Sequence, residues 1–179
     1  MKIEDKKFLN IILRYLFLAL IAIPGFDFFY FIFLPLTKFP VFYLLGFFYE
    51  PFILENTIFI LGRSIEIVNA CVAGSAYYFL LMLNFSTPNI KWEKRLRMVL
   101  FGFLVFLGIN IIRIFVLSLM YLNDSQFFDF THKLFWYLGS TLFIVVIWFV
   151  QVRNNKVRSI PFYSDLKYIY RKSSFKKKK

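Results

Sequence analysis

The run LRMVLFGFLVFLGINIIRIFVLSLMY, from Leu96 to Tyr121, decides the fold class of this chain. The hydrocarbon core of a bilayer is about 30 Å thick and a helix rises about 1.5 Å per residue, so roughly 20 mostly apolar residues cross it. The cations of the run are Arg97, near its start, and Arg113, deep inside it. The run therefore predicts a membrane-spanning helix with a guanidinium in its interior, and such a group is functional by default.

The composition agrees with a membrane protein and excludes other classes. Of the 179 residues, 60% are hydrophobic, against roughly 45–50% in soluble domains. The single cysteine, Cys71, excludes an intrachain disulfide framework. A net charge of +12 also suits a nucleic-acid binder, but the cations gather between the apolar stretches and at the C-terminus. We therefore predict contact with anionic membrane lipids and no nucleic-acid partner.

The N-terminal third contains less regular apolar stretches. Phe8–Ile23 predicts a first span that includes Arg14, and Pro24-Gly25 then bends or ends it. The basic start resembles a signal peptide, but no cleavage site follows, so we expect a retained helix. Phe26–Leu36 and Phe39–Phe48 are short and interrupted by prolines, so they form a kinked span, a re-entrant pair or interfacial helices.

The remaining segments complete the predicted architecture. Thr57–Leu61 and Ile65–Val68 are rich in β-branched residues around a glycine turn at Gly62, which predicts a β-hairpin. Ala70–Phe85 and Lys133–Val152 predict further spans. We expect an all-α polytopic membrane protein, a bundle of about four to six transmembrane helices with this hairpin-like segment before the Cys71 helix. Residues 1–152 form one membrane domain, with a catalytic core at about 40–150, and 153–179 a basic cytoplasmic tail.

The distribution of charge predicts the orientation in the plasma membrane. Loops rich in Lys and Arg stay cytoplasmic, which places Lys91–Arg97 and both chain ends inside and Leu122–Thr131 outside. Cys71 and His132 then lie at the external starts of two spans, and Arg113 lies about 9–12 Å below that boundary. An odd number of crossings, one or three, precedes residue 56.

These three side chains suit cysteine-dependent acyl transfer. With Asn69 as N-cap, Cys71 lies in the first turn of its helix, where the helix dipole favours the thiolate. With Thr131 as N-cap, His132 lies in a first turn, which favours a neutral base. Arg113 keeps its charge and stabilises an oxyanion or holds a substrate carboxylate. Each of these residues also has a non-catalytic interpretation. A lone cysteine in an apolar helix is usually a small hydrophobic residue, and a histidine at the membrane boundary is usually an interfacial polar residue.

Three further polar residues are supporting candidates, each with an alternative. Asn110 shares a helix face with the arginine and orients it or adds a hydrogen-bond donor. Ser75 follows the cysteine by one turn, although the small residues of Ala70–Ala76 equally suit close helix packing. Asp129 lies three residues before the histidine and orients it, or is a solvated loop carboxylate.

The order of these motifs resembles the exosortase/archaeosortase family of membrane-embedded cysteine transpeptidases. A glycine-turn hairpin leads into Ile67-Val68-Asn69-Ala70-Cys71-Val72-Ala73-Gly74, followed by Asn110-Ile111-Ile112-Arg113-Ile114 and then by His132 at the opening of the final helix. The Asn-x-x-Arg motif is the most specific part. Bacterial members often carry Ser or Thr and then Gly directly after the cysteine, where this chain has Val72-Ala73. This departure, together with the short chain, fits a compact archaeal-type member better.

The resemblance implies a function and a role for each residue. Cys71 is the nucleophile, Arg113 the electrostatic stabiliser and His132 the acid/base, with no cofactor or metal. Members act on exported proteins with a C-terminal signal made of a motif, a transmembrane helix and a basic cluster, and pass the new C-terminus to an acceptor, in some cases a lipid. The alternative is a non-enzymatic membrane protein, a transporter subunit or assembly factor, in which Arg113 is an anion or helix-pairing site.

Overall fold

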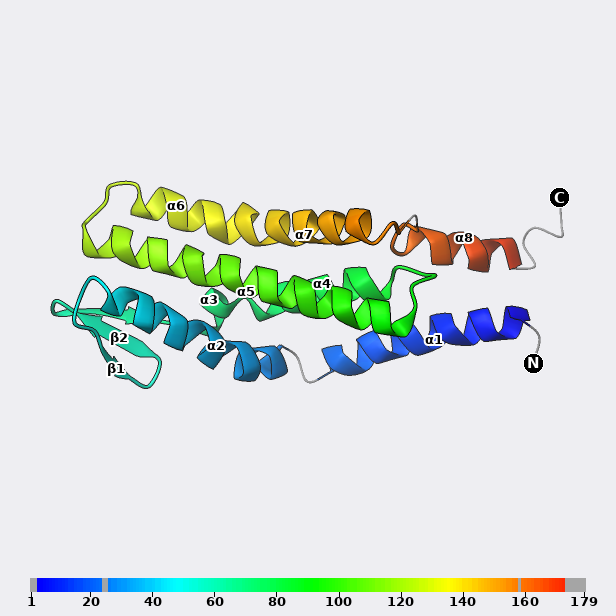
Figure 1. The fold of residues 1–179 in the computed structure, drawn as a ribbon, viewed down its shortest axis with the longest axis horizontal. Coiled ribbons are helices and arrows are strands. Elements are labelled where there is room, and N and C mark those ends of the chain that lie inside the picture. The colour runs from blue at the N-terminus through cyan, green and yellow to red at the C-terminus, as the bar shows by residue number, and fades with distance from the viewer. Residues whose placement is uncertain (1–2, 24–25, 158, 173–179) are drawn as a thin grey trace.

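Helices of unequal length run along one long axis, and a small sheet lies at one end (Figure 1). The structure is a computed structural model that describes residues 3–23, 26–157 and 159–172. The expected bend at Pro24-Gly25 and the tail residues 158 and 173–179 lie outside this part. The elements are α1 (Ile3–Ala22), α2 (Asp27–Gly46), β1 (Phe52–Leu54), β2 (Thr57–Ile60), β3 (Arg63–Glu66), α3 (Asn69–Val72), α4 (Gly74–Phe85), α5 (Trp92–Leu122), α6 (Phe128–Leu134), the π-helical turn η1 (Phe135–Gly139), α7 (Ser140–Asn154) and α8 (Tyr163–Lys172).

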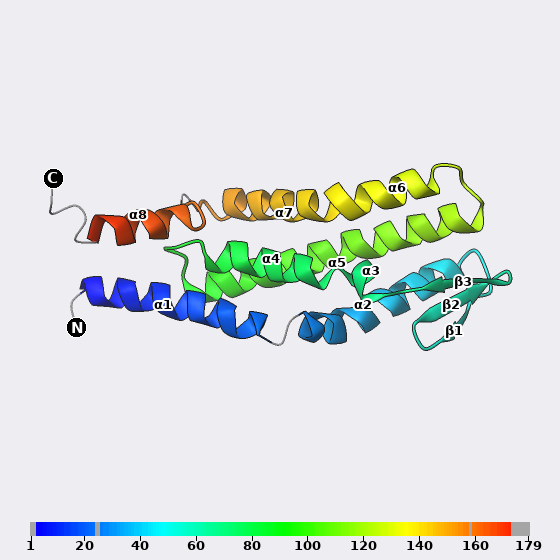
Figure 2. The same ribbon diagram turned by 180° about the vertical axis from the view of Figure 1, so that it is seen from behind.

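The path of the chain along the long axis is simple. It runs toward the sheet through α1 and α2, returns in α3 and α4, runs out again in α5 and returns through α6, η1 and α7 (Figures 1 and 2). Two helices, α2 and α5, are long and apolar enough to cross a membrane, and the bent pair of α6 and α7 makes a third if it forms one span. The chain is thus a mostly helical protein with two or three helices suited to a bilayer.

The interrupted stretch before the sheet forms one continuous helix. Pro35 and Pro40 both lie inside α2, which decides among the alternatives in favour of a single helical segment. Its buried residues recur every four positions, as expected for one face of a helix packed against neighbours, and contacts with α5 and α4 cover them. These residues are Phe29, Phe33, Thr37, Val41 and Leu45. Neither proline falls on this face.

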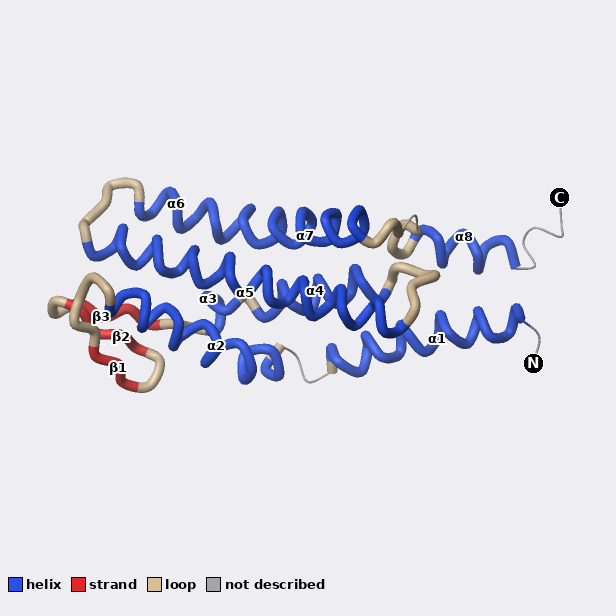
Figure 3. Tube along the Cα trace, viewed as in Figure 1, coloured by secondary structure: helices blue, strands red, loops and turns tan. Residues whose placement is uncertain are grey.

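The predicted hairpin is confirmed, and it belongs to a three-stranded antiparallel sheet of order β1-β2-β3 (Figure 3). Leu61 and Gly62 both have positive φ, +50° and +74°, the conformation of a tight two-residue hairpin turn. Arg63 and the residue after it belong to β3 and not to the turn. The sequence did not indicate β1, a strand of three residues. Lys38 of α2 donates to the carbonyl oxygen of Glu55 in the turn between β1 and β2 at 2.8 Å.

The prediction of one helix over Ala70–Phe85 is wrong. Ala73 has φ +57° and ψ +50°, and this left-handed residue ends α3 and precedes α4. A non-glycine residue pays about 1–2 kcal/mol for that conformation, and it redirects the chain from the sheet into the bundle. At Gly74 an added Cβ would lie 2.6 Å from Cε1 of Tyr30, so α4 starts in close contact with α2. Close packing is therefore what the small residues provide here.

The end opposite the sheet contains a buried ion pair that the sequence did not predict. Arg14 donates to both carboxylate oxygens of Asp165, at 2.9 and 2.8 Å, and to the carbonyl oxygen of Phe85 at 2.9 Å. Asp165 lies in α8 and is 3% exposed. The segment expected to be only a basic tail thus includes a helix held against α1.

Candidate active site

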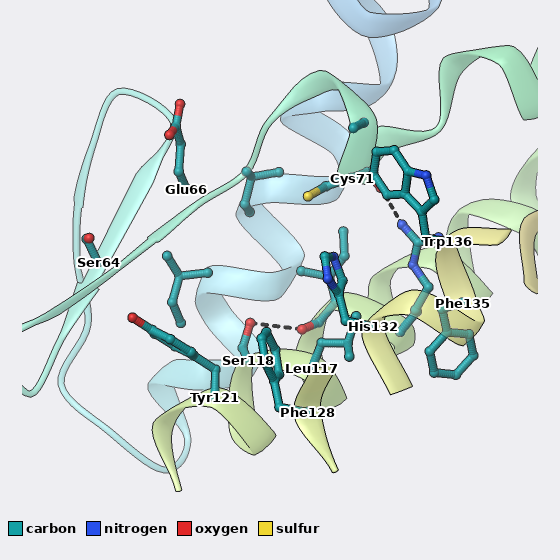
Figure 4. Close-up of a pocket in the computed structure, with 15 residues that line it drawn as sticks. Ser64, Glu66, Cys71, Leu117, Ser118, Tyr121, Phe128, His132, Phe135 and Trp136 are labelled. Carbon is teal, nitrogen blue, oxygen red and sulfur yellow. Dashed lines mark hydrogen bonds between the residues drawn. The ribbon is translucent and has the colours of Figure 1, made fainter. Parts of the chain in front are cut away.

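A cavity of about 320 Å³ opens beside β3, where α3, α5, α6 and η1 meet (Figure 4). Cys71, Arg113 and His132 all line it. They come from three different elements, α3, α5 and α6. The rest of its lining consists of Ser64, Ile65, Glu66, Ile67, Ala70, Ile114, Leu117, Ser118, Tyr121, Phe128, Phe135 and Trp136. The structure therefore brings the three predicted residues to one cavity.

Cys71 lies in the single turn that forms α3. Its backbone N–H donates to the carbonyl oxygen of Val68 at 2.8 Å, and its sulfur points into the cavity (Figure 4). Asn69 is not the N-cap, because the helix starts at Asn69, the cap position belongs to Val68, and no side chain caps it. Four residues carry little of a helix dipole, so the predicted stabilisation of the thiolate by a helix terminus does not apply.

Arg113 connects the cysteine turn to the final helix. Its Nη2 donates to the carbonyl oxygen of Cys71 at 2.9 Å, and its Nη1 donates to Oγ of Ser140 at 3.2 Å. Its Nε is buried without a hydrogen-bond partner. A guanidinium has five N–H groups and these two hydrogen bonds use two of them, so Arg113, which lines the cavity, has N–H groups left to bind a further oxygen atom.

Asn110 provides the second donor that the Asn-x-x-Arg spacing predicts. Its Nδ2 donates to the carbonyl oxygen of Cys71 at 3.0 Å and to that of Val72 at 3.4 Å, and the residue is 2% exposed. Two side chains one turn apart on α5 therefore bind the same carbonyl oxygen. Together they fix the backbone of Cys71 relative to the long helix.

His132 is held by aromatic rings and not by a helix start. Its ring stacks on that of Phe128, with centroids 5.7 Å apart, and lies edge-on to Trp136 at 6.3 Å. The predicted cap at Thr131 is wrong, because α6 begins at Phe128 and the N–H of Thr131 donates to Phe127 at 2.9 Å. His132 is therefore in the last turn of α6, and the argument from a first turn does not apply to it.

The other two supporting candidates lie away from the cavity lining. Ser75 is exposed on α4, because the left-handed Ala73 ends the helix that would have placed it on the face of Cys71. Asp129 is exposed in the first turn of α6 and makes no hydrogen bond with His132. Within the residues that the structure describes, no group of three or more His, Cys, Asp and Glu is arranged to hold a metal ion.

An ion pair at the rim of the cavity was not predicted. Arg63 of β3 donates to both carboxylate oxygens of Asp124, at 2.8 and 2.7 Å, and to the carbonyl oxygen of Tyr121 at 2.9 Å. These hydrogen bonds hold the pKa of Asp124 below its ordinary value of 3.8. They connect the sheet to the turn between α5 and α6. Opposite charges in two predicted external segments were the available signal in the sequence.

The cavity combines a thiol, an imidazole and a guanidinium with largely aromatic and aliphatic walls. Those groups suit attack on a carbonyl carbon, stabilisation of an oxyanion and proton transfer. No hydrogen bond joins the thiol of Cys71 to the imidazole of His132, both of which are described. Comparisons with protein-family models, curated proteins and solved structures find no match to this chain. The residues of the cavity therefore carry the functional argument.

Proposed function

We propose that this chain is a membrane-embedded cysteine transpeptidase or protease that sorts exported proteins. It cleaves a C-terminal signal, made of a short motif, a transmembrane helix and a basic cluster, and transfers the new C-terminus to an acceptor such as a lipid. One observation carries the proposal: Cys71, Arg113 and His132 line a single cavity, in the chain order that resembles the exosortase/archaeosortase family.

The proposed reaction has two halves, and all three groups take part in both. His132 takes the thiol proton, and the sulfur of Cys71 attacks the scissile carbonyl carbon while Arg113 stabilises the oxyanion. The peptide C–N bond breaks as His132 gives this proton to the leaving amine, which leaves a thioester. An acceptor then loses a proton to His132 and attacks the thioester carbon, while Arg113 again stabilises the oxyanion. The C–S bond breaks, and the sulfur of Cys71 recovers the proton from His132. Catalytic hydrogen bonds often tighten only when substrate binds. The absence of a hydrogen bond between the thiol and the imidazole is therefore compatible with these reaction steps.

The proposed membrane arrangement follows the path of the chain. Because α1 and α2 follow one another toward the sheet (Figure 1), we count them as one crossing, the lower of the two numbers that the charges allowed. The pair α3–α4, then α5, and then α6–α7 make three more. This arrangement gives the lower limit of the expected four to six spans. In it the cavity lies on the external side of the plasma membrane, and both termini lie in the cytoplasm.

The test replaces Cys71 with Ala and, separately, with Ser in the native host. The C-terminal peptides of membrane and exported proteins are quantified by mass spectrometry in each variant strain and in the wild-type strain. We expect a set of proteins to keep its C-terminal helix and basic cluster in both variants. Ser75→Ala, on the neighbouring helix, is the control and should leave the set processed. Unchanged C-termini in both Cys71 variants would reject the proposal.

The hydrogen bonds of Arg113 to α3 and α7 also favour the non-enzymatic alternative, in which this residue only pairs helices. An external thiol reagent separates the two. Alkylation of Cys71 abolishes function if the thiol reacts with substrate, whereas a helix-pairing protein keeps its function after alkylation.

A further inference from the structure

One edge of the sheet faces the candidate active site. The strand order β1-β2-β3 leaves β3 with a neighbour on one side only. Ser64, Ile65, Glu66 and Ile67 of this strand and its extension line the cavity together with Cys71. An unpaired strand edge offers a row of backbone donors and acceptors to another chain.

The register shows which backbone groups are free. The N–H of Ile67 donates to the carbonyl oxygen of Asn56 at 2.9 Å, so the backbone groups of Ile67 point toward β2. In an antiparallel pair these groups alternate in direction along the strand. Ile65, opposite Ile58, therefore also bonds to β2, while Ser64 and Glu66 direct their N–H and C=O groups to the open edge. No segment in the described ranges hydrogen-bonds to those four groups.

The opposite wall of the cavity suits the side chains of an extended peptide. Tyr121, Phe128 and Trp136 line it. In Figure 4 the rings of Tyr121 and Phe128 lie on the side of the cavity away from Cys71, and the ring of Trp136 lies beside Cys71. A strand edge on one side and aromatic rings on the other match the two needs of an extended segment, which are backbone hydrogen bonds and contacts for alternate side chains.

We propose that the substrate segment containing the scissile bond binds as an extended strand along β3. It pairs with the backbone of Ser64 and Glu66, places alternate side chains against the aromatic wall and delivers its carbonyl carbon to Cys71. The inference rests on the proposed function, because it takes Cys71 as the nucleophile. It adds the conformation of the substrate and predicts that recognition depends on its backbone as well as on its side chains.

The first test is a proline scan of the two sheet edges. Ser64→Pro removes an N–H that faces the open edge, a position where proline is tolerated. Ile53→Pro is the matched control on β1. The backbone groups of Ile58 bond to β3, so those of its neighbours Thr57 and Phe59 bond to β1. Their partners on β1, Leu54 and Phe52, therefore direct their backbone groups to β2, and the N–H and C=O of Ile53 point outward. Both variants thus lose one outward N–H at an edge, but only Ser64 lies beside the cavity.

The readout is the amount of unprocessed precursor in the native membrane, for substrates identified by comparison with Cys71→Ser. We expect Ser64→Pro to slow processing about tenfold, the effect of a lost hydrogen bond of about 1.4 kcal/mol, and Ile53→Pro to stay within about twofold. Alkylation of Cys71 by a small external reagent should be equal in both variants, which establishes an intact fold. Equal processing in the two proline variants would overturn the inference.

A second measurement uses the unmodified protein and a peptide spanning the cleavage site of such a substrate. N-methylation removes one backbone donor at a time. We expect methylation at alternate positions, and only at those, to abolish competition with substrate, because a strand pairs at every second residue. Equal inhibition by all methylated peptides would overturn the inference while leaving the thiol chemistry intact. Normal processing by Cys71→Ser would instead reject the proposed function.

Discussion

At the scale of single residues, a charged group inside an apolar helix needs a structural reason. Arg113 has one, because its guanidinium binds the backbone of Cys71 and the hydroxyl of Ser140. Asn110 binds the same cysteine carbonyl from one turn below. Asn110 and Arg113 therefore fix the backbone of Cys71 relative to α5. The proposed mechanism gives Arg113 a second role, the stabilisation of the oxyanion.

Arg113→Lys tests this dual role. A lysine keeps the charge but has no planar fork to bind two oxygens at once. We expect processing to fall about 10²- to 10³-fold, the usual effect of removing an oxyanion-stabilising donor. Ser140→Ala removes only one neutral hydrogen bond, worth about 1 kcal/mol, and should cost less than about tenfold. Rates are measured from precursor decay after a pulse label. Equal losses in the two variants would contradict a role in the chemistry.

At the scale of the elements, the junction between α3 and α4 positions the site. Ala73 in the left-handed conformation turns the chain just after Cys71, and Gly74 lets α4 start against the ring of Tyr30. This contact fixes where the cysteine turn sits relative to α2.

Gly74→Ala should lower the free energy of unfolding by about 1–3 kcal/mol, the usual cost of overpacking. The matched control is Gly108→Ala in α5, where nothing lies within 4 Å of an added Cβ. It should be neutral or stabilising by up to about 1 kcal/mol, because alanine favours helix. Unfolding is followed by circular dichroism in a denaturing-detergent titration. Tyr30→Leu should restore part of the loss in Gly74→Ala, and no restoration would mean that the ring is not its cause.

The Arg63–Asp124 pair makes the connection between the sheet and the α5–α6 turn dependent on pH. Because the pKa of Asp124 is lowered from 3.8, the pair stabilises this connection above that pH and is lost as the pH falls through the lowered pKa. Spin labels at Leu61→Cys and Gln126→Cys, in a Cys71→Ser background, should give a narrow distance distribution at neutral pH and a broad one once the pH falls below the lowered pKa of Asp124. With Asp124→Asn added, the distance distribution should be broad at neutral and at acid pH. With Glu66→Gln added, it should change with pH as it does in the spin-labelled protein without this substitution. A narrow distribution for Asp124→Asn would rule the pair out as the link.

At the scale of the whole molecule, polar networks hold the end opposite the cavity. Asp165 of α8 binds Arg14 of α1, which also binds the backbone of Phe85 in α4. Arg95 of α5 donates to the backbone of Asn84 and Thr87. The first and last helices are thus attached to the same turn of the bundle.

Removing one partner of the buried pair leaves a buried charge without compensation. Arg14→Met should therefore lower the free energy of unfolding by about 3–5 kcal/mol, whereas Arg14→Met combined with Asp165→Leu should recover most of it. Trypsin cleavage at Lys167 and Arg171 in native vesicles reports whether α8 is released. We expect faster cleavage in the single variant only. Equal rates in wild type and Arg14→Met would show that α8 is not held by this pair.

Several of these features could be read from the sequence, and the reasons are physical. Long apolar runs and the Gly62 turn are local signals, so α5 and the hairpin were predicted. The left-handed conformation at Ala73 has no local signal, because the residue at that position is neither glycine nor proline. The packing of Gly74 on Tyr30 that accompanies it is a long-range contact. The true starts of the Cys71 and His132 helices were missed because no side chain caps them. The pair of Arg14 and Asp165 joins residues 151 positions apart, and sequence alone gives no partner at that distance.

The most direct test of the central claim is the covalent intermediate on Cys71. Purified protein in lipid nanodiscs is mixed with a processed substrate identified in the host, acid-quenched and digested for mass spectrometry. We predict that the cleaved substrate segment is attached to Cys71 through a bond that neutral hydroxylamine removes, as expected for a thioester. His132→Ala should form less of this adduct, and Cys71→Ala none. Cleaved substrate without an adduct on Cys71, or with Cys71→Ala as active as wild type, would contradict the claim.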